Sequence, residues 1–99
     1  MDITEAAQGF AAMGSESRLE VVQTLVRAGD SGLRVGDIQE RTGIPASTLA
    51  HHLKFLSAAG LILQEKDGRS IFNTANFAHL SALAAFILEH CCIDAEDRP

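Results

Sequence analysis

The stretch RVGDIQERTGIPASTLAHHLKFLSAAGLI, residues 34–62, decides the fold that the sequence predicts. Apolar residues at helical spacing predict a short helix over residues 35–42 and a longer one over residues 46–59. Between them, Gly43-Ile44-Pro45 predicts a tight turn, because the residue before a proline avoids the helical region and proline fits the first turn of a helix. A short helix, a glycine-bearing turn and a second helix are typical of a helix-turn-helix.

Two further helices are predicted before this stretch. Apolar residues recur at helical spacing over residues 3–13, and Gly14 ends that helix. Either Ser15 or Ser17 can cap the next helix, and Glu20 would complete a capping box with Ser17. The expected buried stripe of this second helix consists of Leu19, Val22, Leu25 and Val26.

A hairpin and a last helix are predicted after it. Asp67-Gly68 lies between two short runs that can pair, and it predicts the two-residue loop of a β-hairpin. Helical spacing returns from Phe77 to about Cys92. The predicted fold class is therefore mainly α with a small β-hairpin wing, a winged helix-turn-helix. We expect one DNA-binding and dimerisation domain over residues 1–93 and an acidic C-terminal tail over residues 94–99.

Composition and charge are consistent with a small DNA-binding domain. The chain has 99 residues, 46% of them hydrophobic, and such a short chain buries little core alone, so a homodimer is expected. The net charge is -5, but residues 34–72 carry five basic and four acidic side chains between more acidic flanks. No apolar run is long enough to cross a membrane and no secretory signal begins the chain, so the sequence predicts a cytoplasmic protein.

The second helix of the helix-turn-helix has a face suited to DNA. At about 100° per residue, Leu49, Leu53 and Leu56 lie within one narrow arc, which must face the core. His52 projects close to these leucines and is interpreted as a histidine at the edge of the core or as a further DNA contact. The remaining candidates carry hydroxyl, imidazole or amine groups that can reach base edges and phosphates in a major groove: Ser47, Thr48, His51 and Lys54.

The tip of the hairpin offers two cations beside its turn, Lys66 and Arg69. Arg69 is the better candidate for a minor-groove or backbone contact, because a guanidinium is favoured where the groove is narrow and negative. Without the helix-turn-helix before it, the same hairpin would be interpreted as carrying these charges for solubility alone.

Three segments together resemble the ArsR/SmtB family of dimeric winged-helix repressors. They are GSESRLEVVQTL, RVGDIQERTGIPASTLAHHLKFLSAAGLI and KDGRSIF, and the resemblance covers about residues 5–92. It implies a protein that binds double-stranded operator DNA when free of effector and releases it when a metal ion, metalloid or oxidant binds. It also implies a homodimer built by the first and last helices, with Arg69 in the wing and four residues facing DNA: Ser47, Thr48, His51 and Lys54.

The adjacent thiols Cys91 and Cys92 are the candidate effector site. Soft thiolates select soft ions, and trivalent arsenic binds sulfur. In an ideal helix the two side chains would point about 100° apart, with Cys91 near the apolar stripe, so both reach one atom only if the helix end adjusts. The resemblance extends to arsenic-responsive members with such a pair. Because no third cysteine exists, two thiols suit a trivalent arsenical with one fixed substituent, such as methylarsenite, or arsenite with an added ligand. Packing and thiol oxidation remain alternatives.

A zinc-type alternative rests on His79 and His90. Their spacing of eleven fits the central pair of a family metal pattern, but the outer positions, Phe77 and Ile93, carry no ligand. The sequence offers no Cys-x-x-C, Ser-His-Asp arrangement or glycine-rich phosphate loop. It therefore predicts a regulator without a constitutive cofactor, and not an enzyme.

Overall fold

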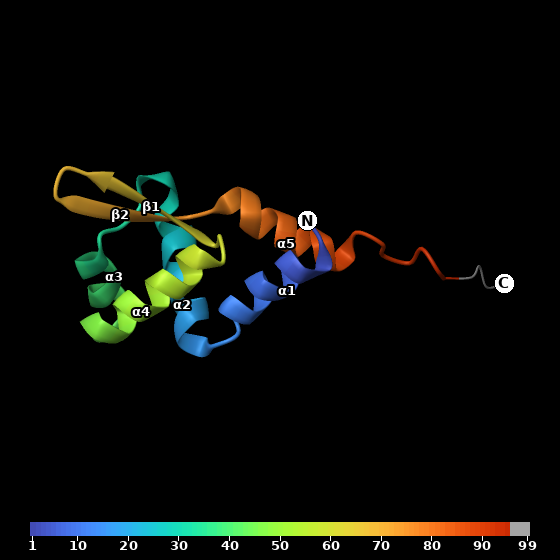
Figure 1. Cartoon of the computed structure of the whole chain (residues 1–99), viewed down its shortest axis with the longest axis horizontal. Helices are drawn as coiled ribbons and strands as arrows, with labels where there is room; N and C mark the ends of the chain where they lie inside the picture. Colours follow the sequence, from blue (N-terminus) through green and yellow to red (C-terminus); the bar gives the residue numbers. More distant parts are fainter. Residues whose placement is uncertain (96–99) are drawn as a thin grey trace.

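A computed structural model of the chain describes residues 1–95 (Figure 1). It contains five α-helices, one short 3-10 turn and one antiparallel hairpin within that range. None of these helices is long and apolar enough to cross a membrane. The acidic tail was predicted over residues 94–99, and residues 96–99 of it lie outside the described residues. In chain order the elements are α1 (Ile3–Ala12), α2 (Glu16–Ala28), η1 (Gly29–Ser31), α3 (Val35–Thr42), α4 (Ala46–Ala58), β1 (Ile62–Asp67), β2 (Ser70–Ala75) and α5 (Phe77–Leu88).

The main core lies where α2, α3 and α4 meet the base of the hairpin. The predicted leucine stripe of α4 is confirmed, since Leu49, Leu53 and Leu56 are all buried. Burial of these side chains away from water is the main force that holds the helix-turn-helix together. The other large side chains of this core are Val21, Val22, Leu25, Ile38, Leu61 and Ile62.

The predicted buried stripe of α2 is partly wrong. Leu19 is 44% exposed and Val26 is 42% exposed, whereas Val21 is fully buried beside Val22. Both α3 and β2 pack against α2, and a stripe read from spacing alone does not show which positions these neighbours cover. Its N-cap is Ser15, whose Oγ accepts a hydrogen bond from the backbone N of Arg18 at 3.1 Å, so the predicted box that begins at Ser17 does not form.

The hairpin turns one residue later than predicted. Asp67 pairs with Ser70, so the two loop residues are Gly68 and Arg69 and not Asp67-Gly68. Gly68 has a φ of 63°, and the tight turns that connect twisted strands need a positive φ at this first loop position. As a result Arg69 stands at the tip of the wing itself.

One buried polar residue ties the wing to the start of the helix-turn-helix. Asn73 of β2 is fully buried, and its backbone exchanges two hydrogen bonds with Leu33, the residue that precedes α3 by two positions. Its side chain donates to the carbonyl oxygen of Leu33 at 3.2 Å and accepts from Gln64 of β1 at 2.8 Å. Because buried polar groups are expensive when unpaired, this network holds the wing at one position beside α3.

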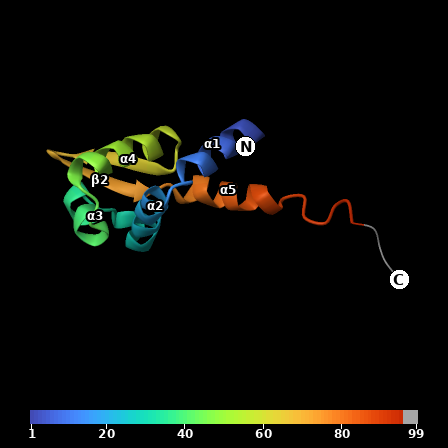
Figure 2. The ribbon, with the colours of Figure 1, turned by 90° about the horizontal axis from the view of Figure 1, so that it is seen from below.

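Helices α1 and α5 lie side by side at the opposite end of the molecule (Figure 2). They approach closely, because a Cβ atom placed on Gly9 of α1 would lie only 2.8 Å from Cδ1 of Leu83. Leu83 is the last fully buried residue within residues 1–95, and α5 ends at Leu88 instead of the predicted Cys92. A helix draws most of its stability from packing, so α5 does not continue far beyond its last buried contact.

Candidate nucleic-acid interface

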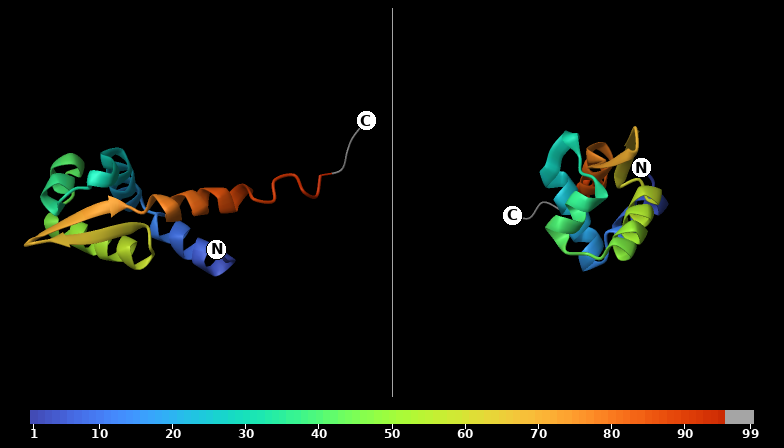
Figure 3. Two further views of the ribbon diagram at one scale, coloured as in Figure 1. Left: turned by 90° about the horizontal axis from the view of Figure 1, so that it is seen from above. Right: turned by 90° about the vertical axis from the view of Figure 1, so that its left-hand side faces the viewer.

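The outward face of α4 carries the four side chains that the sequence proposed for DNA contact. Ser47, Thr48, His51 and Lys54 are all exposed, and we call this set the reading face. The first turn of α4 and the tip of the wing lie at the same end of the molecule, away from the N-terminus and from α5 (Figure 3). A helix and a hairpin placed in this way can approach one duplex together, the helix in a major groove and the wing beside it.

His52 lies on the inner flank of α4 and not on the reading face. Its side chain is half-buried, and its Nδ1 is buried without a hydrogen-bond partner among residues 1–95. Burial lowers the pKa of His52 below its usual 6.5, and the positive charge of Arg18 and then the neighbouring His51 lower it further. This position agrees with the interpretation of His52 as a histidine at the edge of the core.

The lowered pKa of His52 predicts a loss of stability in acid. Below about pH 6.5 the unfolded chain binds a proton at this imidazole that the folded chain does not, so the free energy of unfolding falls as the pH falls toward the folded pKa. We expect urea denaturation to show a larger loss of stability between about pH 7.5 and about pH 5 in the wild type than in His52→Gln. His90→Gln, at an exposed site, is the control, and an equal loss in all three proteins would contradict the prediction.

The wing presents both of its predicted cations to solvent. Lys66 lies near the end of β1 and Arg69 lies in the turn, and both are exposed. The two ion pairs found within residues 1–95 both involve histidine, so neither cation is paired with a carboxylate there. Lys66 and Arg69 can therefore meet a phosphate without first losing an internal partner.

Arg34 joins the helix-turn-helix to the wing, and the sequence did not single it out. Its backbone N donates to the Asp37 carboxylate at 3.2 Å, which caps the start of α3, and its guanidinium lies 5.1 Å from the ring centre of Phe72 in β2. This cation–π contact joins the helix-turn-helix to the wing. Nothing local in the sequence indicated a partner of Arg34 as distant along the chain as Phe72.

The two thiols lie at the other end of the molecule, just beyond α5 (Figure 1). Both are exposed and their Sγ atoms are 3.4 Å apart. The expectation that Cys91 packs near the apolar stripe of a continuing helix is wrong, because the chain after Leu88 forms a series of turns. Cys92 has a φ of 64°, the only positive φ of a non-glycine residue within residues 1–95.

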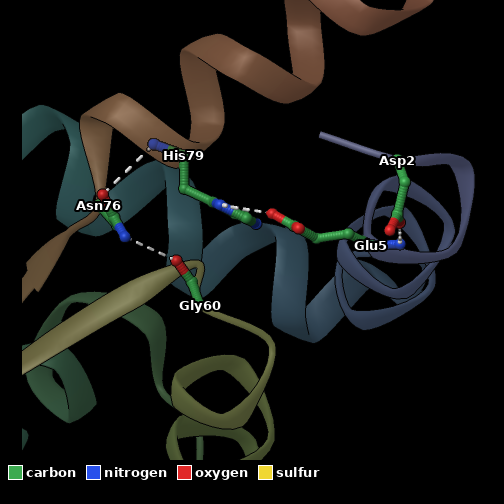
Figure 4. A network of polar contacts seen from close by, with 5 residues as sticks. All are labelled: Asp2, Glu5, Gly60, Asn76 and His79. Atoms are coloured by element: carbon green, nitrogen blue, oxygen red, sulfur yellow. Dashed lines mark hydrogen bonds and ion pairs between the residues drawn. The ribbon is translucent and has the colours of Figure 1, made fainter.

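His79 and His90 have different surroundings, and the contacts of His79 are shown in Figure 4. His79 is mostly buried, with Nδ1 4.0 Å from a Glu5 carboxylate oxygen and Nε2 without a hydrogen-bond partner within residues 1–95. Its backbone N donates to Asn76 Oδ1, and the Asn76 amide donates to the carbonyl oxygen of Gly60 at 2.9 Å. His90 lies beyond α5 beside Glu89. Across residues 1–95 no three His, Cys, Asp or Glu side chains gather closely enough to hold a metal ion.

The fold and the exposed face of α4 define a winged helix-turn-helix protein, and comparison with known proteins identifies the family. A family model described as a helix-turn-helix domain matches residues 13–65. The arsenical resistance operon repressor of Bacillus subtilis is 33% identical over 86 residues, which span 87% of this chain and 78% of that protein. The chain belongs to the ArsR/SmtB family of transcriptional regulators, and it is not an enzyme.

Two further comparisons agree with this family assignment. An uncharacterised helix-turn-helix transcriptional regulator of Bacillus subtilis, YceK, is 39% identical over 64 residues, and the match spans 65% of this chain and 63% of that regulator. Among solved structures, an ArsR-like transcriptional regulator from Rhodococcus sp. RHA1 is 31% identical, with a TM-score of 0.77 over 92% of this chain and 82% of that one. The predicted fold and family are therefore confirmed.

Proposed function

We propose that the protein is a homodimeric repressor that releases operator DNA when a trivalent arsenical binds Cys91 and Cys92. The observation that carries this proposal is the pair of exposed sulfurs 3.4 Å apart at the end of α5. Two thiolates held this close can bind one soft atom without rearrangement of the core. The similarity to a protein named as an arsenical resistance operon repressor supports the same chemistry.

For DNA, we propose that the reading face enters a major groove and that Lys66 and Arg69 of the wing contact the adjacent backbone or minor groove. Ser47 lies in the first turn of α4, the part of such a helix that reaches deepest. Lys54, one turn beyond Ala50, is placed to neutralise a phosphate. His52, half-buried beside Arg18, supports the helix from behind and is the weakest candidate for direct contact.

For assembly, we propose that residues 1–93 form both the DNA-binding and the dimerisation domain, and that α1 and α5 make the dimer. Both helices expose large apolar side chains. A two-fold dimer would cover the same surface on both copies at once. The apolar side chains available to it are Ile3 and Phe10 on α1 and Phe77, Ile87 and Leu88 on α5.

The thiol chemistry is a simple exchange. Methylarsenite, as its dihydroxy form, would lose two hydroxyl groups as water with the protons of Cys91 and Cys92, while two As–S bonds form and the methyl group stays. No electron is transferred and the arsenic remains trivalent. Two thiols satisfy all the exchangeable positions of this species, whereas arsenite would need one more ligand.

The position of Cys91 and Cys92 near the end of α5 suggests how arsenical binding would lead to DNA release. Cys91 lies three residues after Leu88 in the chain, and Ile87 and Leu88 are 64% and 66% exposed on the proposed dimer surface. An arsenical that prefers one arrangement of residues 89–95 changes how α5 meets its partner, and so changes the population of dimers able to hold DNA. Coupling free energies of this kind typically correspond to affinity changes of roughly 5- to 150-fold.

The test is fluorescence anisotropy with a labelled fragment of the protein's own promoter. We expect methylarsenite to weaken binding of the wild type by roughly 10- to 100-fold and to leave Cys91→Ser and Cys92→Ser bound. Zinc is titrated in parallel, with His90→Ala as its control. Release of both serine variants by the arsenical would rule out the thiol site, and release by zinc that His90→Ala abolishes would favour the histidine alternative.

A further inference from the structure

Arg18 lies where α1, α2 and α4 come together. Its Nε donates to the carbonyl oxygen of Ala12 at 2.5 Å, and Nη2 lies 3.5 Å from the carbonyl oxygen of Ala11. These carbonyls belong to the last turn of α1, where intrahelical partners run out. The same guanidinium stands 4.7 Å from the ring centre of Phe55 in α4. One side chain of α2 therefore holds the end of α1 against the flank of α4.

Little else connects α1 and α4 at this point. A groove of about 360 Å³ runs between them, and small side chains make most of its walls. Closely packed helices interdigitate and leave no such space, so the angle between α1 and α4 is not determined by side-chain packing here. The residues that line the groove are Gln8, Ala11, Phe55, Ala58 and Ala59.

Phe55 is next to the reading face. It follows Lys54 in sequence, lies one turn beyond His51 and is 48% exposed. Its ring contributes less to the core than the leucines do, and the Arg18 guanidinium is its principal polar contact. The contact between Arg18 and Phe55 therefore bears on the rotation and tilt of α4 relative to α1.

We infer that Arg18, acting through Phe55, is a positioning residue that sets the separation of the two reading faces in the dimer. This inference rests on the proposed function, in which α1 belongs to the dimer interface and α4 enters the groove. When α1 is held by the partner subunit, the Arg18–Phe55 contact fixes where each α4 points. The separation of the two α4 helices determines which half-site spacing the dimer accepts.

The chemistry of the contact makes arginine specific at this position. The planar guanidinium can donate in its plane to the α1 carbonyls while its face rests on the ring, whereas a lysine ammonium offers no flat surface. Arg18→Lys therefore preserves the positive charge and removes the planar guanidinium. Phe55→Leu preserves apolar volume at a half-exposed site and removes the ring.

The experiment measures the affinity of the wild type and of these two variants for a fragment of the protein's own promoter. The same proteins are then titrated against fragments in which one or two base pairs are added or removed between the half-sites. We expect the wild type to bind most tightly at one spacing. The affinity of Arg18→Lys, of Phe55→Leu and of the double variant should each fall roughly tenfold at that spacing and change little at the others. The double variant should resemble either single variant, because both remove one contact. Arg27→Lys, an exposed change on the same helix, should behave as the wild type does.

The inference would be overturned if both variants kept the spacing preference of the wild type. It would also be overturned if their affinity fell equally at every spacing, because a merely destabilised protein binds all fragments more weakly. Thermal melting and sedimentation of each variant accompany the titrations. Phe55→Leu changes only a half-exposed side chain, so it keeps the test decisive if Arg18→Lys folds poorly. A wild type that binds no promoter fragment at all would instead refute the proposed function.

Discussion

Gly9→Leu is expected to separate α1 from α5 and to weaken both the fold and the dimer. A Cβ atom at position 9 would already lie 2.8 Å from Leu83 Cδ1 and 3.0 Å from Cδ2. Leu83 is fully buried in the core, so a whole leucine side chain at position 9 overpacks the contact. We expect the free energy of unfolding to fall by about 2 kcal/mol, as measured by urea denaturation. Sedimentation should show a larger fraction of monomer.

Two matched variants control this prediction. Leu83→Ala makes room at the contact, so the double variant Gly9→Leu with Leu83→Ala should lose less stability than the sum of the two single changes. Gly36→Ala in α3 meets nothing within 4 Å, and it should stabilise the protein by about 0.5–1 kcal/mol because alanine is the better helix former. Additive losses in the double variant would show that Gly9 and Leu83 do not meet.

Lys54→Glu is expected to abolish operator binding without unfolding the protein. Lys54 is exposed on α4, so neither charge at this position disturbs the core. Each lost phosphate contact weakens binding by roughly tenfold near 0.1 M salt, and a symmetric dimer loses two, so at least a hundredfold loss is expected before the added repulsion. The slope of log affinity against log salt should become shallower by about two.

Lys54→Arg is the control for this second prediction, since it preserves the charge and should remain within a few-fold of the wild type. Circular dichroism should show unchanged helix content in both variants. If Lys54→Glu bound the promoter fragment with an unchanged salt slope, α4 would not be the element that approaches the DNA backbone.

Local signals account for the elements that the sequence predicted well. The helix over residues 35–42 has the bounds of α3 because both of its ends are determined within a few residues. Asp37 accepts from the backbone N of Arg34 at the start, and Gly43 adopts a φ of 74° just after the end. The leucine stripe of α4 follows from helical periodicity alone.

The elements that were misplaced depend on contacts distant in sequence. Asp67-Gly68 and Gly68-Arg69 both suit a tight turn, and the choice between them is made by the burial of Asn73 and Ala75 farther down β2. The end of α5 depends on where its packing against α1 stops.

The candidate site was predictable where it lies on one helix and not where two elements meet. Periodicity alone placed Ser47, His51 and Lys54 on an exposed face. The contacts of Arg34 with Phe72 and of Arg18 with Phe55 join residues that no local pattern connects. The geometry of Cys91 and Cys92 was also beyond the sequence, because it depends on the helix ending before them.

The separation of the thiols from the reading face has a kinetic consequence. Both thiols are exposed and follow α5, which lies at the end of the molecule opposite α3 and the wing (Figure 1), so a duplex bound to the reading face as proposed would leave them open to solvent. Under the proposed function, an arsenical would therefore reach Cys91 and Cys92 while the protein is still on its operator, without waiting for spontaneous dissociation. The proposal then predicts that the lifetime of the complex with DNA shortens as the arsenical concentration rises.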